Sequence, residues 1–126
     1  MEFFFSPAAG DERYFNLEVN PLGNLYLGFR KNREEAARLI LEDPQKQFSL
    51  RTGRTEKGWE AEYEIPADFI ALFFPGFRFV SGATMRGNCY KCGDLTPQVH
   101  YLTWNPMTSG TPDYHRPMDF GCLILE

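Results

Sequence analysis

The sequence lacks the long apolar run and the clustered positive charge that would mark a membrane or nucleic-acid protein. No stretch of about eighteen apolar residues occurs, so no segment is expected to cross a membrane. Lysine and arginine total 13 against 17 aspartate and glutamate, which gives a net charge of -4, and the cations are scattered along the chain. A nucleic-acid interface needs a basic stripe. We therefore expect neither nucleic acid nor membrane insertion.

A recognisable secretion leader is also missing. The apolar start, residues 2–7, is short and carries no basic flank of the kind that precedes a signal peptide. The chain as given therefore leaves the compartment undetermined.

Cysteine and histidine are scarce. The chain has three cysteines, and an odd number excludes a framework made only of disulfides. Cys89 and Cys92 form a C-x-x-C pattern, and with His100 and His115 they could supply zinc ligands, although the spacing matches no zinc finger or ribbon. Free, partly buried thiols are the favoured interpretation, and zinc is the minor alternative.

Aromatic residues, in contrast, are abundant. They make up 16% of the 126 residues and include twelve phenylalanines, while hydrophobic residues reach 43%. This length suits one domain, and the apolar content is enough for a core without disulfide support. Aromatic rings favour strands and ligand-binding surfaces.

Alternating patterns predict strands along most of the chain. In residues 14–20, Phe15, Leu17 and Val19 share one face and polar residues the other. Residues 25–30 alternate in the same way after a Pro-Gly turn, so the two segments predict a hairpin with one solvated face. Further strands are expected at residues 47–52, 57–65, 77–90, 101–104 and 120–125. Many short strands with turns between them indicate an antiparallel β-sandwich.

Two short helices are expected as well. Asn32 with Glu35 forms a capping-box pattern, and Ala36, Leu39 and Ile40 make an apolar stripe that ends before Pro44. A second helix of one or two turns is expected at residues 68–74.

The strand at residues 57–65 carries a row of glutamates that resembles a catalytic array. Glu60, Glu62 and Glu64 alternate with apolar neighbours, and such an alternation is typical of a solvated outer face. Trp59 lies on the opposite, inward face and is expected in the core.

Residues 86–117 are the candidate binding segment. They combine tryptophan, tyrosine, histidine and hydrogen-bonding side chains in loop-like sequence, and binding residues concentrate on loops held by a rigid scaffold. The mixture suits a sugar, whose apolar face stacks on an aromatic ring and whose hydroxyls need directional partners. The expected site has Trp104 as the stacking platform and polar partners Arg86, Asn88, Asp94, His100 and Asn105.

Catalysis is not expected. Glycoside hydrolysis needs two carboxylates across the scissile bond, and nothing fixes the separation of Asp94 and Asp113, the loop carboxylates of this segment. A cysteine with His100 would give a thiol nucleophile and base, but no nucleophile turn or phosphate-binding loop accompanies them.

A series of motifs in this order resembles the family 9-like carbohydrate-binding modules, which are relatives of the DOMON-type sandwich group. The motifs cover nearly the whole chain, and those from Arg86 to Gly121 are the most specific. They are residues 2–7, 14–20, 59–66, 86–94, 100–106, 112–117 and 120–121.

The resemblance implies an immunoglobulin-like sandwich that binds glucan or xylan chain ends outside the cell or at its surface. Family modules hold a sugar between two tryptophans, and Trp104 resembles the later of the two, while Asn88 resembles a polar residue of the preceding strand. Some relatives bind calcium, for which no position is evident in this sequence. The alternative function is a structural or protein-interaction sandwich that keeps the fold without the ligand.

The resemblance also implies several strands before residues 2–7. Their absence from the given chain predicts that residues 3–5 or 14–20 form an exposed apolar edge, and such edges pair with other chains. We therefore expect a homo-oligomer, most simply a homodimer, with its interface at one of these segments.

Overall fold

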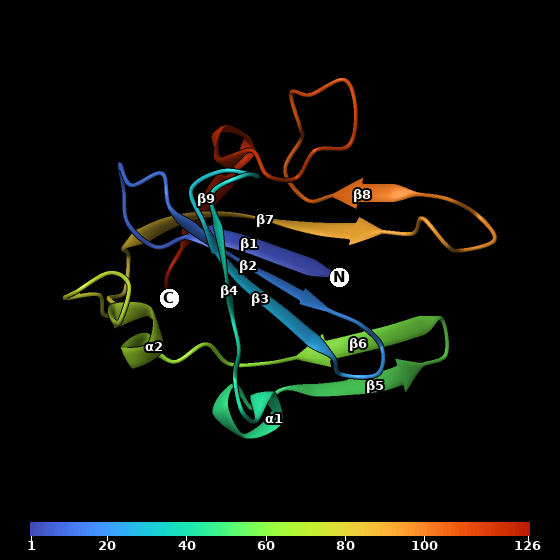
Figure 1. The fold of residues 1–126 in the computed structure, drawn as a ribbon, viewed down its shortest axis with the longest axis horizontal. Coiled ribbons are helices and arrows are strands. Elements are labelled where there is room, and N and C mark those ends of the chain that lie inside the picture. The colour runs from blue at the N-terminus through green and yellow to red at the C-terminus, as the bar shows by residue number, and fades with distance from the viewer.

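A computed structural model describes all 126 residues and shows a seven-stranded antiparallel sheet facing a two-stranded one (Figure 1). The large sheet has the order β4-β3-β2-β1-β7-β8, and β9 also pairs with β7. Its strands are β1 (Glu2–Ser6), β2 (Tyr14–Val19), β3 (Leu25–Arg30), β4 (Ala36–Leu39), β7 (Thr84–Cys92), β8 (Tyr101–Thr103) and β9 (Gly121–Ile124). The small sheet is β5 (Arg51–Thr55) and β6 (Gly58–Glu62), and the α-helices are α1 (Pro44–Gln47) and α2 (Ala67–Ala71). The predicted sandwich with short helices is confirmed.

The main core lies on the face of the large sheet that we call the core face. Phe5 of β1, Phe15 and Leu17 of β2 and Leu27 of β3 are almost fully buried there. They project to one side because side chains alternate along each strand. Ile70 of α2 packs into the same cluster, so the helix and the segment after β6 cover this face.

The opposite face, called the outer face, carries a second and smaller cluster. Phe4, Tyr14 and Tyr90 project to this side from β1, β2 and β7 and are buried. Tyr114 and Phe120 close over them from the C-terminal segment, and the ring of Tyr114 stacks on Tyr90 with centroids 4.1 Å apart. The predicted solvated face of β2 is therefore wrong in part, since a loop distant in sequence covers it.

The predicted helix after Asn32 is also wrong. Asn32 does accept hydrogen bonds from the backbone of Glu34 and Glu35, as a helix cap would, but the chain continues as β4. Residues Ala36 to Leu39 pair with β3, and Lys31 N–H donates to the Glu35 carbonyl to close the turn. Strand pairing available only in the folded chain outweighs the local helical signal.

Other elements follow the sequence more closely. The helix expected at residues 68–74 is present as α2, and Glu60, Glu62 and Glu64 are exposed as predicted. Trp59 is half-buried rather than part of the core clusters. The long strand expected from residue 77 begins only at Thr84, after a turn in which Gly82 adopts a φ of 78°. None of the helices is long and apolar enough to span a membrane.

Neither segment predicted to form an exposed edge lies at an edge. β1 pairs with β2 on one side and β7 on the other, and β2 lies between β1 and β3. Phe4 and Phe5 are 0% and 1% exposed. The predicted location of a dimer interface is therefore wrong. The homodimer itself stays a prediction, but the exposed apolar edge from which it was argued is not present.

An aromatic core of this kind makes a testable prediction about stability. Phe15 is 0% exposed and contacts Phe5, Phe29 and Phe73, so Phe15→Ala should lower the free energy of unfolding by about 3–5 kcal/mol. Urea denaturation followed by fluorescence measures this. Leu22→Ala is the control, because Leu22 is 82% exposed and its loss should change stability by less than about 0.5 kcal/mol. Equal effects of the two substitutions would contradict the assigned core.

Candidate functional site

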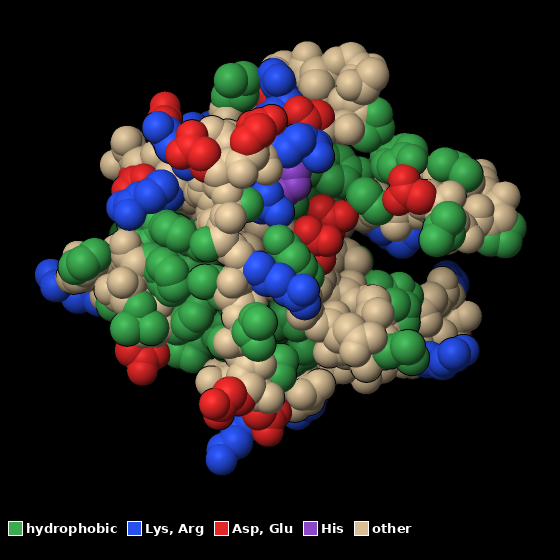
Figure 2. Space-filling model, viewed as in Figure 1, with side chains coloured by type: hydrophobic (Ala, Val, Ile, Leu, Met, Phe, Trp, Pro, Cys, Tyr) green, Lys and Arg blue, Asp and Glu red, His purple; other side chains and the backbone are tan.

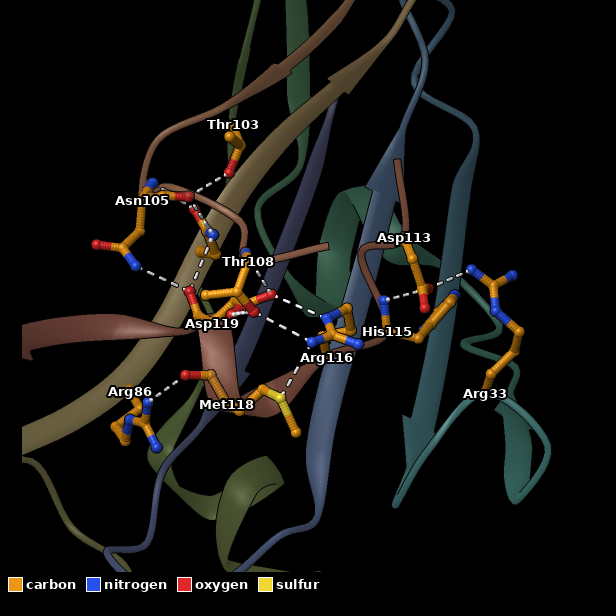
Figure 3. Close-up of polar contacts among 11 residues, drawn as sticks. Arg33, Arg86, Thr103, Asn105, Thr108, Asp113, His115, Arg116, Met118 and Asp119 are labelled. Atoms are coloured by element: carbon orange, nitrogen blue, oxygen red, sulfur yellow. Dashed lines mark hydrogen bonds and ion pairs between the residues drawn. The ribbon is translucent and has the colours of Figure 1, made fainter. Parts of the chain in front are cut away.

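The C-terminal loop, residues 105–119, covers the outer face and is anchored by one buried carboxylate. The Asp119 side chain is 1% exposed and accepts hydrogen bonds from the Thr108 hydroxyl at 2.7 Å and from Arg116 Nε at 3.0 Å (Figure 3). Burial opposes ionisation of Asp119, but these hydrogen bonds outweigh it and lower its pKa. A charged group without such partners would be costly at this depth, so the loop is held in one arrangement.

Asn88 fixes the same loop from the strand side. This side chain is 0% exposed, donates to the carbonyls of Asn105 and Asp119, and accepts from the Asn105 N–H at 2.8 Å. Asn105 in turn donates its side-chain amide to the Asp119 carbonyl at 2.9 Å (Figure 3). All strong hydrogen-bonding capacity of Asn88 is used within the protein, so Asn88 supports the loop and does not face a ligand.

The loop and the outer face together line an open polar pocket of about 420 Å³. On the face shown in Figure 2, carboxylates, cations and a histidine gather beside a notch between the β7–β8 hairpin and the rest of the molecule. Six of the nine lining residues are polar or charged. The lining comes from β1 (Glu2), β2 (Glu18), the β3–β4 turn (Arg33), β7 and its end (Cys92, Asp94), β8 (Tyr101) and the C-terminal loop (Pro112, Tyr114, His115).

The charges of this polar pocket are unbalanced. Arg33 pairs with Asp113 of the loop at 2.5 Å and lowers the pKa of that carboxyl group (Figure 3). Glu2, Glu18 and Asp94 form no ion pair. Burial raises the pKa of Glu2; a hydrogen bond with Cys92 and the N-terminal ammonium oppose this rise, and the nearby carboxylates Glu18 and Asp94 add to it. The pocket thus presents three carboxylates that form no ion pair within the protein.

Tyr101 supplies the exposed aromatic ring of the polar pocket. It is 42% exposed, and its hydroxyl donates to Asp94 Oδ1, which raises the pKa of the tyrosine. This bond fixes the ring beside a carboxylate whose second oxygen is free to accept. A flat ring next to hydrogen-bond acceptors is the combination that a pyranose requires.

His115 lies at the inner wall of the polar pocket. Its ring packs 5.1 Å from the Phe4 centroid, and Nδ1 is 3.0 Å from the Tyr14 hydroxyl. Burial lowers the pKa of His115 to about 4, and the cations Arg30 and Arg33 lower it further while Asp113 opposes them. The imidazole is therefore neutral at pH 7 and serves as a hydrogen-bonding group without charge.

The structure separates the six residues that the sequence singled out. Asp94 alone lines the polar pocket. Asn88 and Asn105 meet, but as loop anchors. Arg86 projects from the other end of β7 and donates to the carbonyl of Met118 (Figure 3) and to that of Phe120.

Trp104 and His100 lie on the opposite face of the β7–β8 hairpin from Tyr101. Trp104 is 56% exposed, and its ring packs on Gly121 so closely that a Cβ added there would lie 2.7 Å from a ring carbon. His100 lies between Lys91 and the Gln98 carbonyl, packed on Gly93. Because the Gln98 carbonyl only accepts, Nδ1 of His100 carries the proton and Nε2 accepts from Lys91. Neither side chain reaches the polar pocket.

The arrangement of the thiols does not fit a zinc site. Cys89 and Cys92 are three positions apart on β7, so their side chains point to opposite faces of the sheet. No group of three or more His, Cys, Asp or Glu lies close enough to hold a metal ion. Burial raises the pKa of Cys92 to about 11, so this thiol is uncharged at pH 7 and a poor nucleophile.

Several lining residues were missed by sequence reasoning. Glu18 was assigned to a solvated face and Arg33 to the start of a helix, and both join the site only because the C-terminal loop folds over β2. Tyr101 and Tyr114 lay in the rich segment without an assigned role, and His115 was considered there only as a possible zinc ligand. The strict alternation of residues 14–20 did place Glu18 away from the core, and that signal could have marked it.

The neutral state of His115 predicts a dependence of stability on pH. The folded-state pKa lies below the unfolded value of about 6.5, so the stabilisation is present above pH 6.5 and is lost as pH falls towards 4. Between pH 7.5 and 4.5, the wild type should lose roughly 1–2 kcal/mol more stability than His115→Gln, after allowance for partial exposure. Urea titrations of both proteins at the two pH values measure the difference, and identical losses would contradict the assignment.

Comparison with known proteins places this chain in a wider group. No curated protein matches the chain. A candidate carbohydrate-binding protein from Bacteroides uniformis ATCC 8492 has a similar crystal structure, with a TM-score of 0.76 and 30% sequence identity over 99% of this chain. This chain spans 60% of the length of that protein. The family model for carbohydrate-binding family 9 matches residues 1–125, and the chain therefore belongs to carbohydrate-binding family 9.

Proposed function

We propose that this chain binds carbohydrate without cleaving it and that the polar pocket holds the sugar. One observation carries the proposal: the exposed ring of Tyr101 lies in the same pocket as carboxylates that form no ion pair. The chain that carries this pocket belongs to a carbohydrate-binding family. The same membership supports a place outside the cell or at its surface.

The chemistry of the polar pocket matches the two sides of a pyranose. The ring of Tyr101 offers a platform for the C–H face of the sugar. Glu18 and Asp94 accept hydrogen bonds from hydroxyls, while Arg33 and His115 can donate to ring or hydroxyl oxygens. Stacking with a few hydrogen bonds gives weak affinity, on the order of micromolar to millimolar.

Catalysis has little support in this arrangement. Asp113, one of the two loop carboxylates considered from the sequence, is held in an ion pair with Arg33. The pKa of Cys92 is raised, so the thiol in the polar pocket is not activated. We therefore expect no glycan hydrolysis by this chain.

Trp104 provides a second position for stacking. Its exposure of 56% argues against burial of the indole under the loop, the arrangement that would favour a purely structural sandwich. It lies on the other face of the β7–β8 hairpin, so stacking on Trp104 and binding in the polar pocket are separable by mutation.

Tyr101→Ala and Trp104→Ala form the pair of substitutions that tests the site. Titration of the wild type with neutral oligosaccharides, followed by calorimetry, should show binding that Tyr101→Ala weakens roughly fivefold through loss of the ring. Trp104→Ala should leave that affinity within about twofold. The reverse pattern would assign the sugar to Trp104, and no binding of any sugar at millimolar concentration would favour the structural sandwich.

The charge of the polar pocket predicts selectivity between sugars. Glu2, Glu18 and Asp94 repel an anion, so a uronic acid oligosaccharide should bind at least roughly tenfold more weakly than its neutral counterpart. The difference should shrink at high salt, because screening weakens exposed charges. Equal affinities for the two ligands at low salt would contradict binding in this pocket.

A further inference from the structure

A fully buried asparagine is bonded to Glu18, one of the residues that line the polar pocket. Asn16 projects from β2 to the outer face and is 0% exposed. Its side-chain oxygen accepts from Arg30 Nε at 2.8 Å, and its side-chain nitrogen donates to Glu18 Oε1 at 2.9 Å. A buried amide is stable in a protein only when such partners are present.

The chemistry of Arg30 allows only one orientation of this amide. A guanidinium group donates and never accepts, so the oxygen of Asn16 must face Arg30 and its NH₂ group must face Glu18. Arg30 is itself held in place, because it also donates to the Tyr26 hydroxyl at 3.0 Å and to the Arg33 carbonyl at 3.0 Å. The fixed guanidinium thus determines where the asparagine places its donor.

The neighbouring strand leaves room for this geometry. Asn16 pairs with Gly28 of β3, and a Cβ built on Gly28 would lie only 2.2 Å from Asn16 Oδ1. Any larger residue would push the amide away from Arg30. The close approach of Asn16 is what requires glycine here; the backbone conformation does not, because the φ of Gly28 is not in the left-handed region.

Glu18 is the last member of this chain of hydrogen bonds. It lines the polar pocket, forms no ion pair, and receives Asn16 on Oε1, so Oε2 has no protein donor. We propose that Asn16 is a positioning residue that aims the free oxygen of Glu18 at a donor hydroxyl of the sugar. This inference rests on the proposed function and adds to it how the acceptor is oriented.

If position 16 had only a structural role, an apolar side chain would be enough. An apolar side chain at position 16 would pack beside Phe4 and Tyr14 without any need for a partner, and replacing a buried polar pair by apolar groups is often neutral. The asparagine instead connects a fixed cation to the one carboxylate of β2 that faces the pocket. The two roles differ in what a swap of the amide and the carboxylate should do.

The test exchanges the amide and carboxylate between the two positions. In Asn16→Asp, two carboxylates face each other, so Glu18 turns away and affinity for a neutral oligosaccharide should fall roughly tenfold or more. In Glu18→Gln, Asn16 still donates to the side-chain oxygen, so an NH₂ group replaces the acceptor in the pocket and affinity should fall by a similar factor. Calorimetric titration measures both.

The double variant Asn16→Asp with Glu18→Gln carries the decisive result. The new carboxylate can accept from both Arg30 and the new NH₂ group, which turns the side-chain oxygen at position 18 back towards the sugar. The double variant should therefore bind more tightly than either single variant, to within about threefold of the wild type. Gln45→Glu makes the same chemical change as Asn16→Asp on exposed helix α1 and should leave affinity unchanged.

The outcomes separate this inference from the proposed function. If the wild type binds sugar and Asn16→Asp does not weaken it, or if the double variant is as weak as the two losses combined, Asn16 does not position Glu18. If the wild type binds no sugar, the proposed function fails and this inference with it. Circular dichroism and thermal melting establish that each variant is folded. If Asn16→Asp alone does not fold, Glu18→Gln carries the test, because position 18 is partly exposed. An unchanged affinity of Glu18→Gln would then overturn the inference.

Discussion

Because β1 pairs with β2 on one side and with β7 on the other, its side chains have to be covered on both faces of the sheet. Phe5 is buried on the core face and Phe4 on the outer face, each by a different part of the chain. Helix α2 and the segment after β6 cover the first, and the C-terminal loop covers the second. This requirement draws residues 105–119 across the outer face, and the polar pocket exists because they cross there.

The loop itself has little regular structure, so polar contacts hold it. Asp119 is buried as an ionised carboxylate with Thr108 and Arg116, and Asn88 bonds the loop backbone from β7. Such contacts are directional, and they fix a loop more uniquely than apolar packing alone. Asn88 and Asp119 therefore support the loop, and the pocket is lined by neighbouring residues that they hold in place.

The outer face also explains why polar residues of β2 are buried rather than solvated. Asn16 lies beneath the loop side of the sheet with its amide fixed by Arg30, and the next outward residue, Glu18, reaches the polar pocket. Along the outer side of β2, Tyr14 is a buried ring, Asn16 is a buried amide and Glu18 is a partly exposed carboxylate. The accessible carboxylate of Glu18 is therefore held in a fixed direction by the buried amide beside it.

The sequence by itself determined the local elements and the inward side of most strands. Alternation in residues 14–19 placed Phe15 and Leu17 in the core, and the same pattern placed Glu60 and Glu62 outside, because the side-chain period of a strand is a local property. The motifs from Arg86 to Gly121 also indicated the family, which the family model confirms. Tertiary structure decided the rest. Asn32 forms its cap, yet β4 follows because β3 offers pairing partners. Trp104 lies on the opposite face of the β7–β8 hairpin from Tyr101, whose hydroxyl bonds Asp94. Glu18, Arg33 and His115 meet only when distant segments pack on one another, and no local pattern encodes that contact.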